Sequence, residues 1–209
     1  MKQPLFIFPF NGNGLEALDC IDNSRFQFIG FIDDTPEKQG MHDMGFTVFS
    51  RDILKEYFDF RIIAVPGSPS SFMVRDQIIN SLQLDDYYFT TLIHPKASIS
   101  PLAKIGNNVL IMSGVVLTAN VIIEDHVCIL PNTVVHHDST IGKYTLIGSN
   151  CTVAGYTKIG SYCYIGSGSS IINNITVGSN CLIGMGTNVI KDVAHHSKVV
   201  GNPARALTS

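Results

Sequence analysis

The hydrophobic positions of this chain follow a period of six residues over its C-terminal half. Every sixth residue from Ile99 to Val189 is Ile, Leu or Val. The residue four places after each of these, from Ala103 to Val193, is Ala, Val, Thr, Ser or Cys, with Ile175 as the larger exception. A helical stripe of period 3.6 cannot keep this register, which excludes bundles and coiled coils. The pattern predicts a β-solenoid with one aliphatic and one small buried residue per unit.

Six residues make one short strand and its turn, so three units close a triangular coil of eighteen. Five coils at strand spacing give a prism about 24 Å tall. Seven units carry Gly directly after the aliphatic residue, and we expect these glycines to supply positive φ at tight corners. They are Gly106, Gly142, Gly148, Gly160, Gly166, Gly178 and Gly184. The period alone does not give the handedness of the coil.

The N-terminal part has a different pattern, in which apolar strands alternate with helical segments. This alternation predicts an α/β sheet of largely parallel strands. All 12 phenylalanines lie at or before Phe89, so we place the change of architecture near residue 94 and expect domains over 1–93 and 94–209. The predicted strands are 4–9, 26–32, 46–49, 60–65 and 87–93, and the predicted helices lie near 14–22, 50–57 and 71–83.

Two features of this first domain indicate a half-Rossmann unit that binds one nucleotide. Asn11-Gly12-Asn13-Gly14 follows the first strand and leads into a helix, and Asp33 and Asp34 end the second strand, where a Rossmann fold places its ribose-binding carboxylate. Pro66-Gly67-Ser68, after the fourth strand, is a further candidate loop. The alternative is a plain surface turn with a solvated acidic pair.

Composition and charge narrow the classes of partner. The net charge is −3 without a Lys/Arg run, which gives no reason to expect nucleic acid or an anionic membrane as partner. No apolar span of 18 residues occurs, and the opening apolar stretch is too short for a signal peptide, so we expect a cytoplasmic protein. The five cysteines lack zinc-site spacing, and Cys151, Cys163 and Cys181 occupy small inward positions, so we interpret them as structural.

Several motifs resemble those of the hexapeptide-repeat acyltransferases, in the branch of nucleotide-sugar 4-amino N-acetyltransferases and sialic-acid O-acetyltransferase-like proteins. The resemblance implies a half-Rossmann α/β domain followed by a left-handed parallel β-helix, assembled as a homotrimer. It also implies acetyl-CoA as cosubstrate, bound in a groove between subunits, and no metal. The motifs are Val134-Val135-His136-His137-Asp138-Ser139-Thr140-Ile141-Gly142, Val153-Ala154-Gly155, Gly201-Asn202-Pro203-Ala204-Arg205, Phe28-Ile29-Gly30-Phe31-Ile32-Asp33-Asp34 and Ile93-His94-Pro95-Lys96-Ala97.

Acetyl transfer needs a base, and histidine suits this role because it titrates near neutrality. His137 has a carboxylate beside it in Asp138, and the resemblance implies that these are the general base and its acidic partner. The stacking period of eighteen places Gly155, Asn173 and Lys191 above His137. Gly155 leaves room beside the imidazole, and its N–H is a candidate oxyanion donor.

We call His137 and the residues stacked above it, Gly155, Asn173 and Lys191, the column, and this column predicts the path of acetyl-CoA. Lys191 lies three coils from His137, roughly 14 Å at strand spacing, which is comparable with a pantetheine arm. We therefore expect the thioester at His137 and the phosphates near Lys191, Lys198 or Arg205. The predicted acetyl-CoA-binding residues are Gly155, Asn173, Lys191, Asn202 and Pro203.

The resemblance implies a nucleotide-linked 4-amino-4,6-dideoxy sugar of bacterial surface polysaccharide, such as lipopolysaccharide, as the acceptor. This chain departs from the family at two places. The usual Gly-x-Gly-Gly-His loop is replaced by Pro9-Phe10-Asn11-Gly12-Asn13, and a second histidine nine residues after the base is replaced by Leu146. The expected acceptor residues are Asn11, Gly12, Asn13, Asp33, Asp34, Pro66 and Gly67.

Three other functions stay open from the sequence. The first is O-acetylation of a sialic-acid-like sugar, and the second is a non-catalytic nucleotide-sugar-binding module, which Leu146 would favour. The third is a metal-dependent hydratase with His126, His136 and His137 as candidate zinc ligands, although adjacent corner residues generally point apart.

Overall fold

The N-terminal sheet has the predicted parallel arrangement, with one added strand. The computed structural model describes residues 2–207. In this sheet β1 (Gln3–Phe8) lies between β5 (Arg61–Ala64) and β2 (Phe26–Ile32), and β2 pairs with β4 (Thr47–Phe49), all in parallel. The unpredicted β3 (Gly40–Met41) closes the edge antiparallel to β4, so the order is β3-β4-β2-β1-β5.

The connecting helices are shorter than the sequence indicated, because most of them are single 3-10 turns. The segment predicted as a helix over 50–57 is a 3-10 helix. The helices are α1 (Gly12–Ala17), η1 (Leu18–Cys20), η2 (Pro36–Lys38), η3 (Arg51–Glu56), η4 (Phe72–Val74), α2 (Arg75–Asn80) and η5 (Asp86–Tyr88). In the described part of the chain, no helix combines the length and the apolar character needed to cross a membrane.

The strand predicted over 87–93 is wrong in its extent and in its partner. Phe89 makes a single bridge to Ile62, and only β6 (Leu92–Ile93) is a strand. β6 pairs with β9 (Leu110–Ile111) of the solenoid and not with the N-terminal sheet, because the Leu92 N–H donates to the Val109 carbonyl of the next coil. The segment therefore forms the first rung of the second domain.

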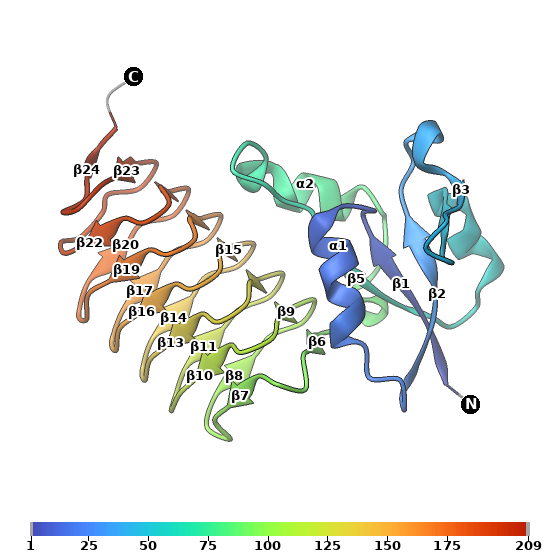
Figure 1. Ribbon diagram of the computed structural model, residues 1–209, viewed down its shortest axis with the longest axis horizontal. Helices are drawn as coiled ribbons and strands as arrows, with labels where there is room; N and C mark the ends of the chain where they lie inside the picture. Colours follow the sequence, from blue (N-terminus) through green and yellow to red (C-terminus); the bar gives the residue numbers. More distant parts are fainter. Residues whose placement is uncertain (1, 208–209) are drawn as a thin grey trace.

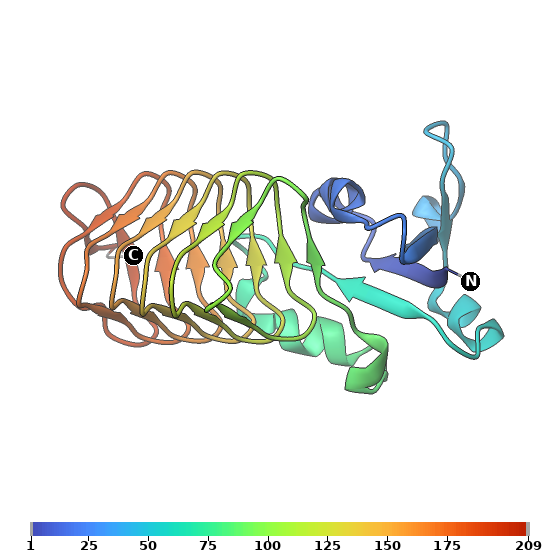
Figure 2. The ribbon, with the colours of Figure 1, turned by 90° about the horizontal axis from the view of Figure 1, so that it is seen from below.

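The solenoid is a left-handed parallel β-helix, as expected (Figure 1). Up to Val189 the strands of the solenoid are two residues long and pair in parallel with the strand eighteen residues away, whereas the last strand pairs antiparallel with its neighbour. The strands form three flat faces (Figure 2). We call the faces of β7-β10-β13-β16-β19-β22 and β8-β11-β14-β17-β20 the first and second face, and that of β6-β9-β12-β15-β18-β21-β23-β24 the third face. The strands are β7 (Ser98–Ile99), β8 (Lys104–Ile105), β9 (Leu110–Ile111), β10 (Val116–Leu117), β11 (Ile122–Ile123), β12 (Cys128–Ile129), β13 (Val134–Val135), β14 (Thr140–Ile141), β15 (Leu146–Ile147), β16 (Thr152–Val153), β17 (Lys158–Ile159), β18 (Tyr164–Ile165), β19 (Ser170–Ile171), β20 (Thr176–Val177), β21 (Leu182–Ile183), β22 (Asn188–Val189), β23 (Lys198–Val200) and β24 (Arg205–Ala206).

The aliphatic and small positions of the repeat fill the interior of the prism, which contains the main hydrophobic core. The register changes near the end of the solenoid. β23 pairs with β21 at an offset of sixteen residues, and Val193 bridges to Val177, an aliphatic position. Val193 therefore does not continue the series of small residues as predicted, because the last coil is two residues shorter.

The seven glycines after the aliphatic positions do not adopt positive φ, so that expectation was wrong. Glycine is needed at these positions because the next coil leaves no room for a side chain: a Cβ at Gly142 would lie 2.6 Å from the backbone of Gly160. Positive φ occurs two residues later, at every sixth residue from Asn108 to Gly186. All of these corner residues are Asn, Gly, Tyr, His or Asp. Asn, Asp and His are enriched at positive φ because their short polar groups suit this backbone conformation.

The N-terminal domain packs on the third face of the solenoid. Leu5 and Ile7 of β1 share one hydrophobic cluster with Leu110, Cys128 and Leu146 of this face. Polar contacts join the same surfaces, since the Asn108 side chain bonds both the N–H and the carbonyl of Ala64 at the sheet edge, at 2.7 and 2.9 Å. All five cysteines are buried free thiols.

Candidate active site

His137 and Asp138 lie at the corner between β13 of the first face and β14 of the second face. Asp138 occupies the positive-φ position of this corner, at 59°. Its Oδ2 lies 2.9 Å from His137 Nδ1. Hydrogen bonds from Asn120, and then from His137, hold the pKa of Asp138 below its usual value. An ionised carboxylate only accepts hydrogen bonds, so the ring N–H of His137 that faces Asp138 is the one at Nδ1.

Gly155 forms the floor beneath the imidazole. A Cβ at this position would lie 2.7 Å from His137 Cε1 and 2.9 Å from Nε2, so only glycine leaves the ring where it is. The ring of Tyr156 meets the imidazole edge to face at 5.1 Å between centroids. The His137 ring is therefore fixed by a carboxylate, an aromatic ring and the backbone of the next coil, while half of its side-chain surface stays exposed.

A pocket of about 360 Å³ opens at this ring and contains part of the predicted column. The coils are aligned by hydrogen bonds from the Tyr156 N–H to the His137 carbonyl and from the Asn174 N–H to the Gly155 carbonyl. Stacking by eighteen thus brings His137, Gly155 and Asn173 together. The residues that line the pocket are His136, His137, Ala154, Gly155, Tyr156, Asn173 and Asn174.

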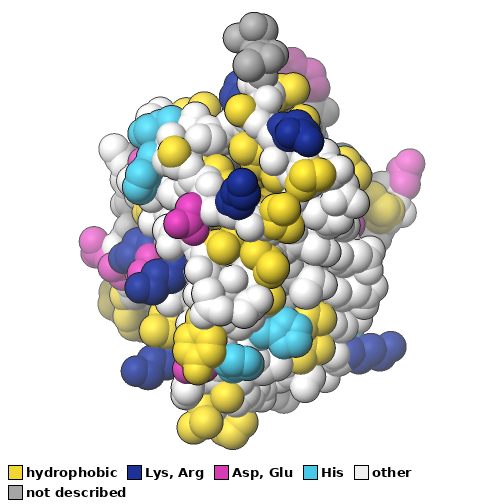
Figure 3. Space-filling view, turned by 90° about the vertical axis from the view of Figure 1, so that its left-hand side faces the viewer, with side chains coloured by type: hydrophobic (Ala, Val, Ile, Leu, Met, Phe, Trp, Pro, Cys, Tyr) yellow, Lys and Arg dark blue, Asp and Glu magenta, His cyan; other side chains and the backbone are white. Residues whose placement is uncertain are grey.

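Lys191 lies outside this pocket, in a second cavity of about 510 Å³ at the C-terminal end of the solenoid. Pro203 and Arg205 line the same cavity, whereas Asn202 is exposed and does not. Figure 3 views the molecule from this end and shows Lys and Arg side chains among hydrophobic ones. The exposed Ile172 and Ile190 follow Ile171 and Val189 on the first face, one residue before Asn173 and Lys191. They form an apolar flank along the column.

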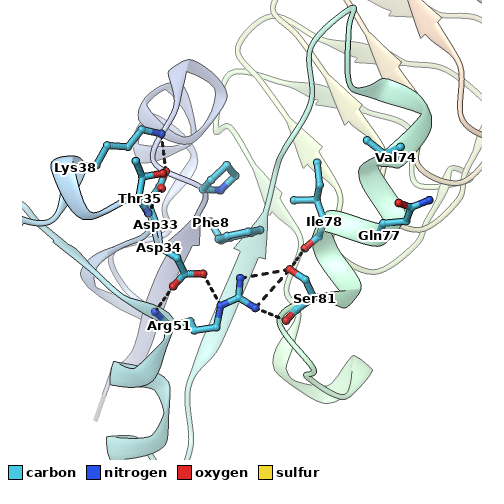
Figure 4. A pocket seen from close by; sticks show the side chains of 11 residues that line it. Phe8, Asp33, Asp34, Thr35, Lys38, Arg51, Val74, Gln77, Ile78 and Ser81 are labelled. Atoms are coloured by element: carbon cyan, nitrogen blue, oxygen red, sulfur yellow. Dashed lines mark hydrogen bonds and ion pairs between the residues drawn. The ribbon is translucent and has the colours of Figure 1, made fainter.

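The N-terminal domain has a separate crevice of about 720 Å³ at the carboxyl ends of β1 and β2 (Figure 4). Both predicted acidic residues line it. Asp33 is 5% exposed and pairs with Lys38 Nζ at 2.7 Å. Burial raises the pKa of Asp33, but hydrogen bonds from Lys38 and Thr35 outweigh burial and leave this pKa below its usual value. Asp34 binds the side chain and the backbone N–H of Arg51, which also donates to Ser81.

The predicted binding loops lie beside this crevice and bond to each other. Asn11 caps α1 by accepting the Gly14 N–H at 2.8 Å. The Asn13 amide reaches the Gly67 carbonyl at 3.4 Å, so the loops after β1 and β5 form one unit. Asn11, Gly12, Asn13, Pro66 and Gly67 are absent from the crevice lining.

A buried arginine fixes this unit against the solenoid. Arg75 begins α2 and is fully buried; its Nε donates to the Pro66 carbonyl at 2.6 Å and its Nη1 to the Tyr144 carbonyl at 2.7 Å. Burial lowers the pKa of Arg75 from its ordinary value. Arg75 thereby ties the loop after β5 to the corner between the second and third faces.

The crevice and the His137 pocket lie on different sides of the prism within one chain. The N-terminal domain covers the third face, whereas His137 lies at the corner between the first and second faces, the only corner that the third face does not share. Leu146, at the position of the family's second histidine, is 2% exposed in the cluster between the domains and does not line the His137 pocket.

The histidines proposed as zinc ligands do not come together. His126 lies at the corner between the second and third faces, stacked on Tyr144 at 4.5 Å and bonded to Asn108 at 2.9 Å. His136 and His137 lie at the opposite corner. Among residues 2–207, no three or more His, Cys, Asp or Glu side chains are grouped to hold a metal ion.

Several residues of the two sites were missed from the sequence, among them Asn120, Tyr156, Lys38 and Arg51. Asn120 and Tyr156 lie eighteen residues before and after Asp138, so the stacking period that gave Gly155 also gives these two neighbours. Lys38 and Arg51 come from the 3-10 helices η2 and η3, which lie outside the six-residue repeat, so no stacking rule places their side chains.

Comparison with known proteins finds the same fold in solved structures. The family described as the GMPPB C-terminal domain matches residues 88–183. The acetyltransferase domain of PglB from Neisseria gonorrhoeae FA1090 superimposes with a TM-score of 0.87 at 28% identity over 99% of this chain and 100% of that one. PerB from Caulobacter crescentus, solved with CoA and GDP-perosamine, gives a TM-score of 0.86 at 22% identity over 100% and 98%. WeeI from Acinetobacter baumannii AYE gives a TM-score of 0.83 at 24% identity over 99% of this chain and 100% of that one.

The fold and the corner site define a hexapeptide-repeat protein with a left-handed β-helix. The match to PglB extends over both domains, including the α/β part that precedes the helix. Over both domains the chain is similar to solved hexapeptide-repeat sugar acetyltransferases.

Proposed function

We propose that this protein transfers the acetyl group of acetyl-CoA to the amino group of a nucleotide-linked 4-amino-4,6-dideoxy sugar. The observation that carries the proposal is the His137 imidazole, which Asp138 holds at Nδ1, which packs against Gly155 and which lines a pocket. The similar PglB domain was solved in complex with acetyl coenzyme A, and PerB with CoA and GDP-perosamine. These complexes support both substrate classes.

In the proposed reaction the sugar amine attacks the thioester carbonyl carbon. His137 Nε2 takes the proton that the nitrogen loses as the new C–N bond forms, and Asp138 stabilises the resulting imidazolium. The C–S bond then breaks, and the CoA sulfur leaves as a thiolate that takes up a proton. The Gly155 N–H is the candidate donor to the carbonyl oxygen, whose negative charge develops in the transition state.

The column above His137 offers a path for the CoA arm. Asn173 supplies an amide in the same pocket, and Ile172 and Ile190 supply an apolar flank for the pantetheine. Lys191 and Arg205 share the terminal cavity and suit the phosphates, because their charge complements the phosphate anions. Pro203 shapes the wall of this cavity.

We place the nucleotide in the crevice at Asp33 and Asp34, where Lys38 and Arg51 supply positive charge. A sugar bound there faces away from His137 of its own chain, because the prism lies between them. We therefore infer that the crevice of one subunit serves the base of another, as a homotrimer would allow. Such an enzyme would act in the cytoplasm in the assembly of bacterial surface polysaccharide.

The test is release of free thiol from acetyl-CoA against UDP-, dTDP- and GDP-linked 4-amino-4,6-dideoxy sugars. Fast release with one of them, with an amide product that resists hydroxylamine, supports the proposal. An ester product would indicate O-acetylation. No release with any sugar, while acetyl-CoA still binds, would contradict the proposal and favour a non-catalytic module.

The shared site has a test of its own. His137→Ala removes the base, and Asp34→Lys alters the crevice, so each variant alone should be inactive. Co-expressed as mixed oligomers, they should regain part of the activity, because some sites then combine an intact crevice with an intact base. Absence of any recovery in oligomers shown to be mixed would contradict a site shared between subunits.

A further inference from the structure

We propose that Asn120 is a positioning residue that orients the Asp138 carboxylate and, through it, selects the reactive tautomer of His137. This inference rests on the proposed role of His137 as base. Asn120 Nδ2 donates to Asp138 Oδ1 at 3.0 Å, and Asp138 Oδ2 accepts from His137 Nδ1 at 2.9 Å. The two hydrogen bonds use different oxygens of one carboxylate.

Both oxygens must be held for the carboxylate to keep its plane. The χ2 torsion of Asp is broad, and the Asp138 side chain is partly open to solvent, so a single bond to His137 leaves the group free to turn toward water. The second bond from Asn120 removes this freedom. A fixed Oδ2 then keeps the proton on Nδ1 and the lone pair on Nε2.

The backbone favours asparagine at this position. Asn120 has φ of 60° and lies one coil before Asp138 in the same corner ladder. Asparagine tolerates this left-handed conformation and carries an amide donor, whereas an aspartate there would place a second negative charge against Asp138. The Asn120 side chain does not line the His137 pocket, so its effect passes through Asp138.

The chain supplies a matched control in Asn150. This residue has the same corner geometry, with φ of 56°, but it lies between the first and third faces, away from the His137 pocket. Alanine costs the same backbone strain at both corners. A difference between Asn120→Ala and Asn150→Ala therefore reports the hydrogen bond to Asp138 and not the corner.

The first readout is kinetic. We expect Asn120→Ala to lower kcat about tenfold, the effect of one hydrogen bond to a charged group, and to leave the KM for acetyl-CoA unchanged. Asn120→Asp should lower kcat at least as much, because it removes the donor and adds repulsion. Asn150→Ala should keep the wild-type kcat. A wild-type kcat in Asn120→Ala, or an equal loss in Asn150→Ala, would overturn the proposal.

The second readout does not depend on turnover. Nitrogen-15 spectra of the histidine rings, with His137 assigned by its loss in His137→Ala, distinguish the two neutral tautomers. We expect the wild-type protein and Asn150→Ala to show protonated Nδ1, and Asn120→Ala to show a mixture. Unchanged ring signals in Asn120→Ala would overturn the positioning role. If the wild-type protein transfers no acetyl group, the proposed function fails while this spectral test still applies.

Discussion

Replacing Gly155 with alanine tests how tightly the candidate base is seated. The new Cβ would lie 2.7 Å from His137 Cε1, 2.9 Å from Nε2 and 3.2 Å from Nδ1. Carbon atoms pack best at about 3.5–4.0 Å, so the ring must move by about 1 Å. Because half of the His137 side-chain surface is exposed, the ring can swing outward without disturbing the solenoid core.

A displacement of about 1 Å in a catalytic constellation costs about 100-fold in rate. We therefore expect Gly155→Ala to lower kcat about 100-fold in the thiol-release assay. The melting temperature should stay the same or rise, because Gly155 does not adopt positive φ and alanine reduces the freedom of the unfolded chain by about 0.4–1 kcal/mol. Affinity for acetyl-CoA, measured by calorimetry, should change much less than kcat.

A double-mutant cycle separates ring displacement from other effects. In a His137→Ala background the new methyl group has no imidazole to displace, so Gly155→Ala should add no further loss. An undiminished kcat for the single variant would refute the packing argument. A second 100-fold loss in the double variant would show instead that Gly155 acts on the substrate directly.

Three further predictions follow from other parts of the structure. Leu146→Ala should lower the free energy of unfolding by about 2–5 kcal/mol in urea titrations, because Leu146 is buried between the domains; a change below 1 kcal/mol would contradict that packing. Burial lowers the pKa of His126 from 6.5, so the unfolded chain binds protons more readily than the folded one, and stability should fall as the pH drops below about 6.5. His126→Gln should weaken this pH dependence of the melting temperature, and an unaltered pH dependence would rule out His126 as its source. Lys191→Ala should raise the KM for acetyl-CoA and leave the KM for the sugar unchanged. An unchanged KM for acetyl-CoA would contradict the proposed path of the CoA arm to Lys191.

The sequence predicts the solenoid well because a strict period converts directly into neighbours in space. Stacking by eighteen predicts Gly155 and Asn173 beside His137, and both line the same pocket as His137. The same period accounts for the positions of Asn120 and Tyr156 near His137, since both lie one coil from Asp138. Prediction was weaker for the last coil, where two residues are missing from the period and Val193 moves to an aliphatic position.

The N-terminal domain could be predicted only in outline. Its parallel strands followed from alternating patterns, but the crevice depends on side chains of short 3-10 helices, such as Lys38 and Arg51, whose positions no repeat fixes. The packing of this domain on the third face follows from contacts between distant segments, for example Asn108 with Ala64. That packing separates the crevice from His137, which local sequence patterns do not reveal.

The most direct test of the central claim is the rate of acetyl transfer in wild-type protein and in His137→Ala with the same nucleotide-linked amino sugar. A single general base contributes about 10²–10⁴-fold, so we predict a loss of this size with nearly unchanged binding of acetyl-CoA. Transfer by His137→Ala at the wild-type rate would contradict the assignment of His137 as the base.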